Sequence, residues 1–328
     1  LWKAKKMVKK KNIFLSDYGG VICQEIFGSG LTLSKTIEIK NCSVSAKSIT
    51  GNSSIYIGGI VGGGFGASAQ AGSQLSITDC KVVGDISGIG AGGIVGVSFG
   101  AQAQSNSRLS IHGCYVSAKS IKGNGAGGIA GYRFGFNAQS NSRLSILGCK
   151  VDGNITGLGA GGIAGGSVEI KDGDGNKEII SFGQESKKGS QLSILGCYFY
   201  GTITKTSSGG IVGDVSNTFG GTAIIKSCYV ARNITDSTTP TPSTIKLKYI
   251  GDDNSKKITL DNNQISQNGW NQELATSSIG LDVIPGASSN VPSYDHNVYW
   301  CHDSINQNIN NAKAWLLKWE EGCSNNTS

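Results

Sequence analysis

Apolar and polar residues alternate with a period of two in short segments that recur along the chain. Typical segments are Leu75-Ser76-Ile77, Leu109-Ser110-Ile111 and Leu144-Ser145-Ile146, and a cysteine follows each of them three residues later. Alternation over such short runs, rich in β-branched residues and without a 3.6-residue stripe, predicts β-strands. The repeated part of the chain is therefore predicted to be all-β.

The strand segments belong to a sequence repeat, most clearly seen where 92–114 returns almost unchanged as 127–149. A Gly-Gly step recurs every 34 to 39 residues until an insertion lengthens one interval. The Gly-Gly steps begin at Gly19, Gly58, Gly92, Gly127, Gly161 and Gly209; an aromatic residue follows at Phe27, Phe65, Phe99, Phe134, Phe182 and Phe219; a cysteine follows at Cys42, Cys80, Cys114, Cys149, Cys197 and Cys228. Such a repeat indicates a stack of similar units.

Short strands in register, separated by glycine and small polar residues, predict a parallel β-solenoid, or β-helix, over 16–235. It should have about six coils, each stacked on the next at the ~4.8 Å spacing of paired strands, with its phenylalanines and cysteines in columns. The usual handedness of parallel crossovers favours a right-handed coil. Open ends of such a stack favour end-to-end or lateral self-association.

Three segments flank the predicted solenoid. Residues 1–15 are a basic leader, interpreted as a solvated end, with a membrane or nucleic-acid arm as the alternative. The Thr/Pro-rich stretch 236–244 is the best linker candidate. Residues 245–328 are predicted to cap the solenoid or form a small module, with a hairpin of 244–250 and 258–260 and one helix over 311–321.

Charge excludes one class of partner. The formal net charge is +7, but Lys3, Lys5, Lys6, Lys9, Lys10 and Lys11 supply six of these charges, so 7 − 6 leaves +1 for the rest of the chain. Tracking phosphates needs clustered cations, so we expect no nucleic-acid partner for the solenoid. No apolar run is long enough for a membrane span.

The insertion after the Gly-Gly step at Gly161, 166–180, is predicted to project from the coil as a binding loop. It concentrates charge in a chain of which 16% is charged: Glu169, Lys171, Asp172, Asp174, Asn176, Lys177 and Glu178 are the candidate contacts for a protein or glycan. The stretch that begins at Asp172 resembles the start of an EF-hand calcium loop, but its sixth position, which needs glycine, is Lys177. A hairpin around a Gly-Asp-Gly turn needs no metal, and a neutral decorative hairpin is the alternative.

The six cysteines at one repeat position are predicted to form a column of buried thiols. Disulfides between coils are the alternative, although parallel strands in register orient Cβ poorly for them. Cys301 and Cys323 flank the predicted helix and could form a disulfide that fixes it. Cys301-His302 lacks zinc-ligand spacing, so no metal site is predicted.

Two further sets of polar residues are candidate surface sites. Gln70, Gln104 and Gln139 lie five residues after their phenylalanines and predict a polar ladder, which makes a flat array that binds ice or glycans an alternative function. Glycosylation sequons begin at Asn41, Asn52, Asn154, Asn233, Asn325 and Asn326, and Asn41 is placed at a corner.

Residues for catalysis are not gathered at one repeat position. Enzymes that cleave polysaccharides on β-helices need carboxylates or bases on one face. Asp85 and Asp152 fall at different offsets, His112 replaces the leucine of the next copy, and no Asp, Lys or Arg set is identified at a shared position. The chain is predicted to be no enzyme and to need no cofactor; a polysaccharide-active β-helix lyase or hydrolase is the alternative.

The repeat resembles the GLUG-type repeat family. The resemblance rests on 148–157 with 161–165 and on the Cys-Tyr steps at Cys114, Cys197 and Cys228, and it covers about 19–235. The AQAQSNS segments depart from the family's shorter spacer. Members look like modules of surface and secreted proteins, including adhesins. The resemblance implies an extracellular or cell-surface structural or adhesive protein that binds a protein or glycan, with no secretion signal visible in this sequence.

Overall fold

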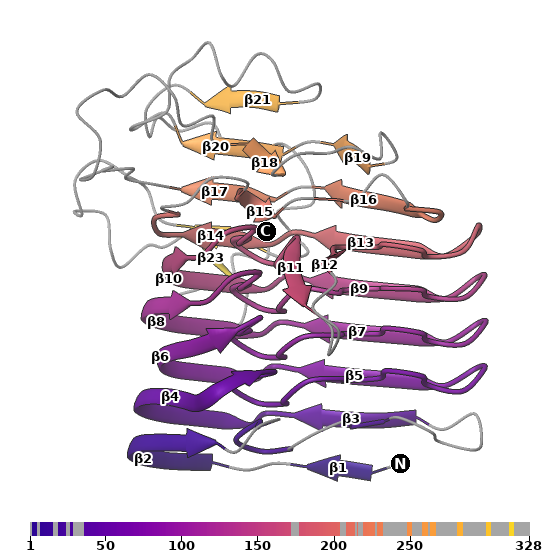
Figure 1. The fold of residues 1–328 in the computed structure, drawn as a ribbon. Helices are drawn as coiled ribbons and strands as arrows, with labels where there is room; N and C mark the ends of the chain where they lie inside the picture. Colours follow the sequence, from indigo (N-terminus) through magenta and orange to yellow (C-terminus); the bar gives the residue numbers. More distant parts are fainter. Residues whose placement is uncertain are drawn as a thin grey trace, which may run out of the picture.

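The chain forms an all-β solenoid of stacked parallel strands (Figure 1), seen in a computed structural model. The structure describes residues 2–4, 7–15, 19–23, 27–28, 36–171, 177–203, 208–213, 215, 219–226, 228–231, 248–250, 258–261, 263–266, 281–284, 300–302 and 315–317. No helix occurs among these residues. The β-solenoid predicted from the repeat is confirmed; its handedness and its number of coils stay predictions.

Two parallel sheets form the walls of the solenoid. The first, called sheet A, has the order β1-β3-β5-β7-β9-β13-β16-β19, and the second, sheet B, has the order β2-β4-β6-β8-β10-β14-β17-β20-β21. Sheet A consists of β1 (Trp2–Ala4), β3 (Thr36–Lys40), β5 (Gln74–Thr78), β7 (Arg108–His112), β9 (Arg143–Leu147), β13 (Gln191–Leu195), β16 (Thr222–Lys226) and β19 (Ile258–Asp261). From β1 to β20 each coil thus adds one strand to each sheet, and β21 adds a further strand to sheet B.

Sheet B follows sheet A after a short corner in every coil. Its strands are β2 (Met7–Leu15), β4 (Ser43–Ile55), β6 (Lys81–Ile89), β8 (Tyr115–Lys122), β10 (Lys150–Thr156), β14 (Tyr198–Tyr200), β17 (Tyr229–Ala231), β20 (Asn263–Ser266) and β21 (Leu281–Ile284). The register is strict where the sequence repeat is strict: Leu109 lies opposite Leu144, and Ile111 lies opposite Ile146.

The corner between the sheets requires a left-handed backbone conformation. Its residues are Asn41, Asp79, Gly113, Gly148 and Gly196, the first two with φ of 54° and 51°. Asparagine and aspartate tolerate this conformation better than other residues with a Cβ, and glycine carries no penalty. The backbone amide of each of the five donates to a carbonyl of the next coil, as in Asn41 N to Thr78 O at 3.1 Å. Asn41 is therefore a corner residue, as predicted.

The Gly-Gly steps bring neighbouring coils into close backbone contact. Gly92 forms parallel bridges with Gly58 and Gly127. A Cβ on Gly92 would overlap the carbonyl oxygen of Val95. The repeated glycines therefore allow an inward fold of each coil that a side chain would prevent.

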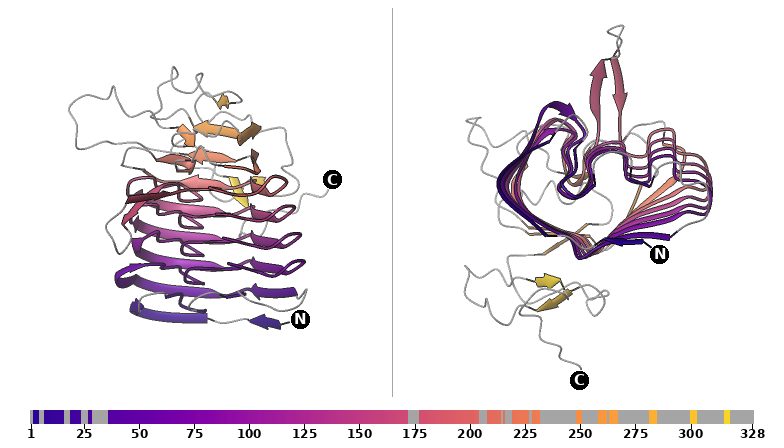
Figure 2. Two further views of the ribbon diagram at one scale, coloured as in Figure 1. Left: turned by 45° about the vertical axis from the view of Figure 1, so that its right-hand side comes forward. Right: turned by 90° about the horizontal axis from the view of Figure 1, so that it is seen from below.

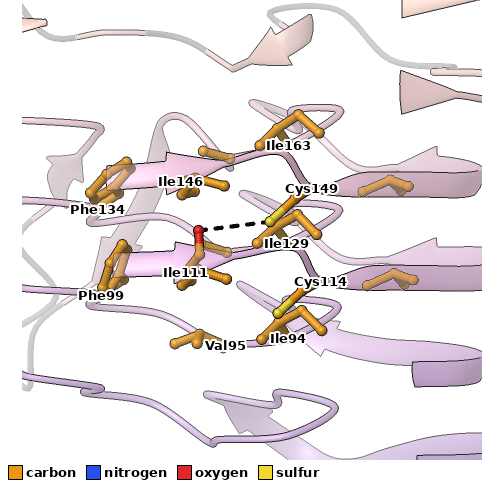
Figure 3. Packing of buried hydrophobic residues seen from close by; sticks show 14 of the residues in the cluster. Ile94, Val95, Phe99, Ile111, Cys114, Ile129, Phe134, Ile146, Cys149 and Ile163 are labelled. Atoms are coloured by element: carbon orange, nitrogen blue, oxygen red, sulfur yellow. Dashed lines mark hydrogen bonds between the residues drawn. The ribbon is translucent and has the colours of Figure 1, made fainter. Parts of the chain in front are cut away.

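Identical apolar residues stack in columns through the interior (Figure 3). Phe99 and Phe134 are fully buried with ring centroids 4.8 Å apart, and Ile111 and Ile146 are buried beside them. The column runs from Phe27 to Phe219, with centroid separations of 6.0, 5.7, 4.8, 5.1 and 6.4 Å. The predicted stacking of phenylalanines is confirmed.

The basic leader predicted for 1–15 is wrong where the structure describes it. β1 pairs with β3 and β2 pairs with β4, so these residues are strands of the two sheets. Val8 and Ile13 fall opposite Val44 and Ile49, and Ile13 is buried. Val8 and Ile13 thus keep the register of the equivalent apolar residues in the next coil.

The C-terminal predictions also need correction. The hairpin of 244–250 with 258–260 is wrong: β18 (Lys248–Ile250) pairs in parallel with β15 (Gly209–Val212), and β19 pairs with β16. The open edge of the preceding coil supplies these partners, so the solenoid continues beyond 236–244, a stretch outside the described residues.

The predicted helix over 311–321 is wrong at its centre. Residues Trp315–Leu317 form β23, antiparallel to β22 (Trp300–His302), and the rest of that range lies outside the described residues. Cys301 lies in β22, while Cys323 is outside the described part. The interpretation of 245–328 as a cap stays a prediction.

Candidate binding surfaces

The insertion forms a hairpin that projects from the wall of the solenoid (Figure 2). Its strands β11 (Val168–Lys171) and β12 (Lys177–Ile180) are antiparallel, with Val168 opposite Ile180 and Lys171 opposite Lys177. The predicted hairpin is confirmed. The sheets on either side keep their register, because β9 pairs directly with β13.

The base of the hairpin is anchored in a second apolar cluster outside the main core. We call this the aromatic cluster; its members are Val97, Ala101, Tyr132, Phe136, Val168 and Ile180. Val168 and Ile180 are buried against it, while Ile179 is 60% exposed. Burial raises the pKa of the Tyr132 hydroxyl, so the tyrosine stays neutral. The hairpin is therefore fixed at its base and exposed beyond it.

The candidate contacts on the hairpin are charged and exposed where their side chains are described. Glu169, Lys177 and Glu178 are exposed, and the Lys177 Nζ lies 3.0 Å from the Glu169 Oε1. The side chain of Lys171 and all of Asp172, Asp174 and Asn176 lie outside the described part, so the structure does not test a calcium loop there.

Two of the three glutamines of the predicted ladder, Gln104 and Gln139, turn their side-chain amides into their own loops. The Nε2 of Gln104 donates to the carbonyl of Gln102 at 3.0 Å, and that of Gln139 donates to the carbonyl of Asn137 at 2.9 Å. Their backbone amides bond to Ala69 and Ala103 of the preceding coil. Gln70 is exposed. The side chains of Gln104 and Gln139 therefore stabilise the loops in which they lie.

Sequon asparagines that the structure describes are at the surface. Asn41 is exposed at its corner. Asn154 is exposed, and its Oδ1 accepts from the Thr202 amide at 3.0 Å. Asn52 lies in β4 without a described side chain, and Asn233, Asn325 and Asn326 lie outside the described residues. Glycosylation at all six stays a prediction.

The outer face of sheet A carries an arginine pair that the sequence analysis missed. Arg108 and Arg143 are the first residues of β7 and β9, lie directly opposite each other and are exposed. The statement that no basic set shares a repeat position is therefore wrong. The signal was in the sequence: both arginines belong to the repeated segment Ser-Asn-Ser-Arg-Leu-Ser-Ile.

A groove of about 310 Å³ lies over these arginines, and we call it the arginine groove. It spans four successive strands of sheet A and is lined by Thr36, Gln74, Leu75, Ser76, Arg108, Leu109, Ser110, Arg143 and Ser145. Ser76, Ser110 and Ser145 lie in register beside the arginines and form a column of half-buried hydroxyls. The lining thus holds two cations, several hydroxyls and no carboxylate.

The outer face of sheet B arranges its cations differently. Lys81, Tyr115, Lys150 and Tyr198 lie in one column, in that order. The Nζ of Lys81 and that of Lys150 each lie 5.3 Å from the Tyr115 ring centroid, and that of Lys150 lies 5.8 Å from the Tyr198 centroid. Each lysine therefore stands over an aromatic face, an arrangement that stabilises the cation.

The cysteine column is a row of buried thiols, as predicted. None of the six forms a disulfide and all are buried: Cys42, Cys80, Cys114, Cys149, Cys197 and Cys228. Each of the last five donates to an isoleucine carbonyl of the preceding coil, as in Cys149 Sγ to Ile111 O at 3.8 Å (Figure 3). Burial raises the pKa of the Cys114, Cys149 and Cys197 thiols well above the ordinary value. Because the thiolate is the reactive form, these cysteines are inert.

Acidic residues of the described ranges are dispersed. Asp79 pairs with Lys40 at 3.6 Å at a corner, and the Oδ1 of Asp85 accepts from the Ser120 amide on sheet B. Within the described part of the chain, no three His, Cys, Asp or Glu side chains are grouped so as to hold a metal ion. Nor does that part contain a helix with the length and apolarity to cross a membrane.

Comparison of the chain with protein-family models, with curated proteins and with solved structures gave no match. The resemblance to GLUG-type repeats therefore stays a prediction, and the surfaces described above carry the functional argument.

Proposed function

We propose that the protein is a non-enzymatic, surface-exposed or secreted structural or adhesive repeat protein that binds a protein or glycan partner. The observation that carries this proposal is the projecting hairpin. Its base is buried in the aromatic cluster while Glu169, Lys177 and Glu178 are exposed. A charged projection held on a rigid scaffold is the usual form of a recognition loop.

An extracellular or cell-surface location fits the chemistry of the cysteine column. The six thiols are buried, and burial suppresses the ionisation of Cys114, Cys149 and Cys197, so these three do not need a reducing compartment to stay reduced. The resemblance of the repeat to GLUG-type modules of surface and secreted proteins supports the same location.

The dispersion of carboxylates favours binding over polysaccharide cleavage. A glycosidase needs two carboxyl groups flanking one bond. Among the described residues, Asp79 is held by a lysine at a corner and Asp85 by a backbone amide on sheet B. We therefore expect no release of reducing ends or unsaturated products from pectin, alginate or related polymers.

A glycan array and a panel of extracellular-matrix proteins test the proposed function. For each ligand found, affinity is measured for the variant Glu169→Gln/Lys177→Gln and for the control Lys40→Gln/Asp79→Asn, which removes another, half-buried ion pair without changing net charge. We expect the hairpin variant to bind about tenfold more weakly and the control to bind normally. Absence of any ligand, or product release from a polymer, would contradict the proposal.

A further inference from the structure

We propose that the arginine groove binds a linear acidic polysaccharide, with Arg108 and Arg143 holding its carboxylate or sulfate groups. The inference rests on the proposed binding function and names a ligand class and a second site for it, separate from the hairpin. The groove crosses β3, β5, β7 and β9, and four strands at ~4.8 Å spacing extend over about 14 Å. This length suits an oligosaccharide segment and exceeds a single sugar.

The first argument is the electrostatic cost of the arginine pair. Like charges directly opposite each other on neighbouring strands are destabilising. Within the described ranges, neither guanidinium has a hydrogen-bond or ion-pair partner, whereas Lys40 and Lys177 face carboxylates and Lys81 and Lys150 stand over tyrosine rings. An anion between the two arginines would turn this repulsion into attraction.

The second argument is the composition of the groove. A guanidinium binds a carboxylate or a sulfate through two parallel hydrogen bonds. Beside the arginines, Ser76, Ser110 and Gln74 supply groups that can both donate to and accept from sugar hydroxyls. Glu38 lies in the serine column opposite Ser76 but is not among the residues that line the groove. The lining therefore matches a ligand that alternates hydroxyls with negative charges.

The third argument separates a polysaccharide from a nucleic acid. Single-stranded nucleic acids bind through aromatic side chains that stack on bases, and duplexes bind through many phosphate contacts. The groove lining has no aromatic residue and two cations. Its chemistry is thus too sparse in charge and too polar for nucleic acid, and suits a sugar chain.

The experiment measures binding by isothermal titration calorimetry at low and physiological salt. The probes are a heparin-derived oligosaccharide (sulfated), an oligogalacturonate (carboxylated), a neutral malto-oligosaccharide and a short DNA duplex. The test variant is Arg108→Gln/Arg143→Gln. Its control is Lys119→Gln/Lys122→Gln, which removes two exposed cations from β8 on the opposite sheet. Thermal unfolding of each variant is recorded beside the titrations.

We expect at least one acidic probe to bind and the neutral probe to bind far more weakly. Losing a hydrogen bond to a charged group weakens binding about tenfold, so the arginine variant should lose about a hundredfold and the control less than about threefold. The variant Arg108→Lys/Arg143→Lys keeps the charge but loses the paired hydrogen bonds, so its affinity should fall between the two.

Three outcomes would overturn the inference: no acidic probe binds, the DNA duplex binds as tightly as the glycans, or the arginine variant keeps full affinity. The proposed function has its own test. If a ligand is lost on changing the hairpin but not the arginines, the protein is a binding protein and the arginine groove is not its glycan site.

Discussion

Phe99 and Phe134 inside the solenoid and Arg108 and Arg143 on its surface are both identical residues stacked in successive coils. Inside, stacking like on like is favourable, because buried rings with centroids 4.8 Å apart are in contact and exclude water. Outside, the same register places two like charges side by side. The repeat architecture thus stabilises apolar columns automatically, whereas a charged column needs a partner from outside the strand.

On sheet B, the repulsion between stacked like charges is avoided by residues of the chain itself. There the cations Lys81 and Lys150 alternate with Tyr115 and Tyr198 and never lie beside each other. The arginine pair of sheet A lacks such an arrangement. We interpret the difference as one between a face that is stabilised internally and a face that is completed by a ligand.

The largest expected effect comes from putting a charge on the inner side of a strand. Ile111→Asp should unfold several coils, because an unpaired buried charge costs about 3–5 kcal/mol or more. Ser110→Asp, on the outer side of the same strand, is the matched control and should fold normally. Circular dichroism and urea unfolding measure both variants. Equal stability of the two would break the distinction between inside and outside.

The hairpin offers the same comparison on neighbouring residues. Ile180 is buried in the aromatic cluster and Ile179 is exposed. Ile180→Ala should lower the free energy of unfolding by about 2–4 kcal/mol, and Ile179→Ala by less than about 0.5 kcal/mol. Thermal and urea unfolding give both values. A shortened insertion that removes Val168 and Ile180 should therefore be destabilised, and a loss from Ile179→Ala as large as that from Ile180→Ala would show that the base is not anchored.

The thiol column predicts a stability that depends on pH. Burial raises the pKa of the Cys114, Cys149 and Cys197 thiols, so the unfolded chain ionises before the folded one does. Their stabilising contribution is complete below pH ~8.5 and should fall by about 1.4 kcal/mol per pH unit per thiol above it. Urea titrations at pH 7 and pH 10 measure the loss. Cys149→Ala should show a shallower dependence, and an unchanged one would contradict the assignment.

The smallest expected effects have opposite signs on the two outer faces. Arg143→Gln removes a repulsion and should raise the free energy of unfolding by a few tenths of a kcal/mol at low salt. Lys150→Gln removes a cation over two tyrosine rings and should lower it by about 0.5–1 kcal/mol. High salt should abolish the arginine effect first. A destabilised Arg143→Gln variant would remove the electrostatic argument for the groove.

The repeat allowed the solenoid to be predicted because register and burial follow directly from it. Phe99 and Phe134 occupy the same position of the repeat, so their stacking could be predicted. The thiol column and the corner at Asn41 followed from the same alignment of the copies. The same reasoning failed at both ends: no repeat cysteine precedes Met7–Leu15, and Trp315–Leu317 lies beyond the last glycine, phenylalanine and cysteine marks. Met7–Leu15 pairs with the edge that the next coil offers, and Trp315–Leu317 pairs with the separate strand Trp300–His302; local composition encodes neither partner.

The candidate sites were predictable in position but less so in chemistry. The hairpin followed from the break in the repeat, but its anchorage did not, because Val168 meets Tyr132 only through the fold. The orientation of the Gln104 amide toward its own loop also depends on backbone geometry. The arginine pair was visible in the repeat and was missed because the search for shared charges addressed catalysis.

The strict register between 92–114 and 127–149 has an evolutionary consequence. Because each coil bonds to its neighbours through equivalent groups, a tandem duplication of one such segment would insert a coil without disturbing the rest of the stack. Every inserted copy of Ser-Asn-Ser-Arg-Leu-Ser-Ile would also lengthen the arginine row by one residue. Avidity for a long polyanion could then evolve by changing the number of copies, with no point mutation needed.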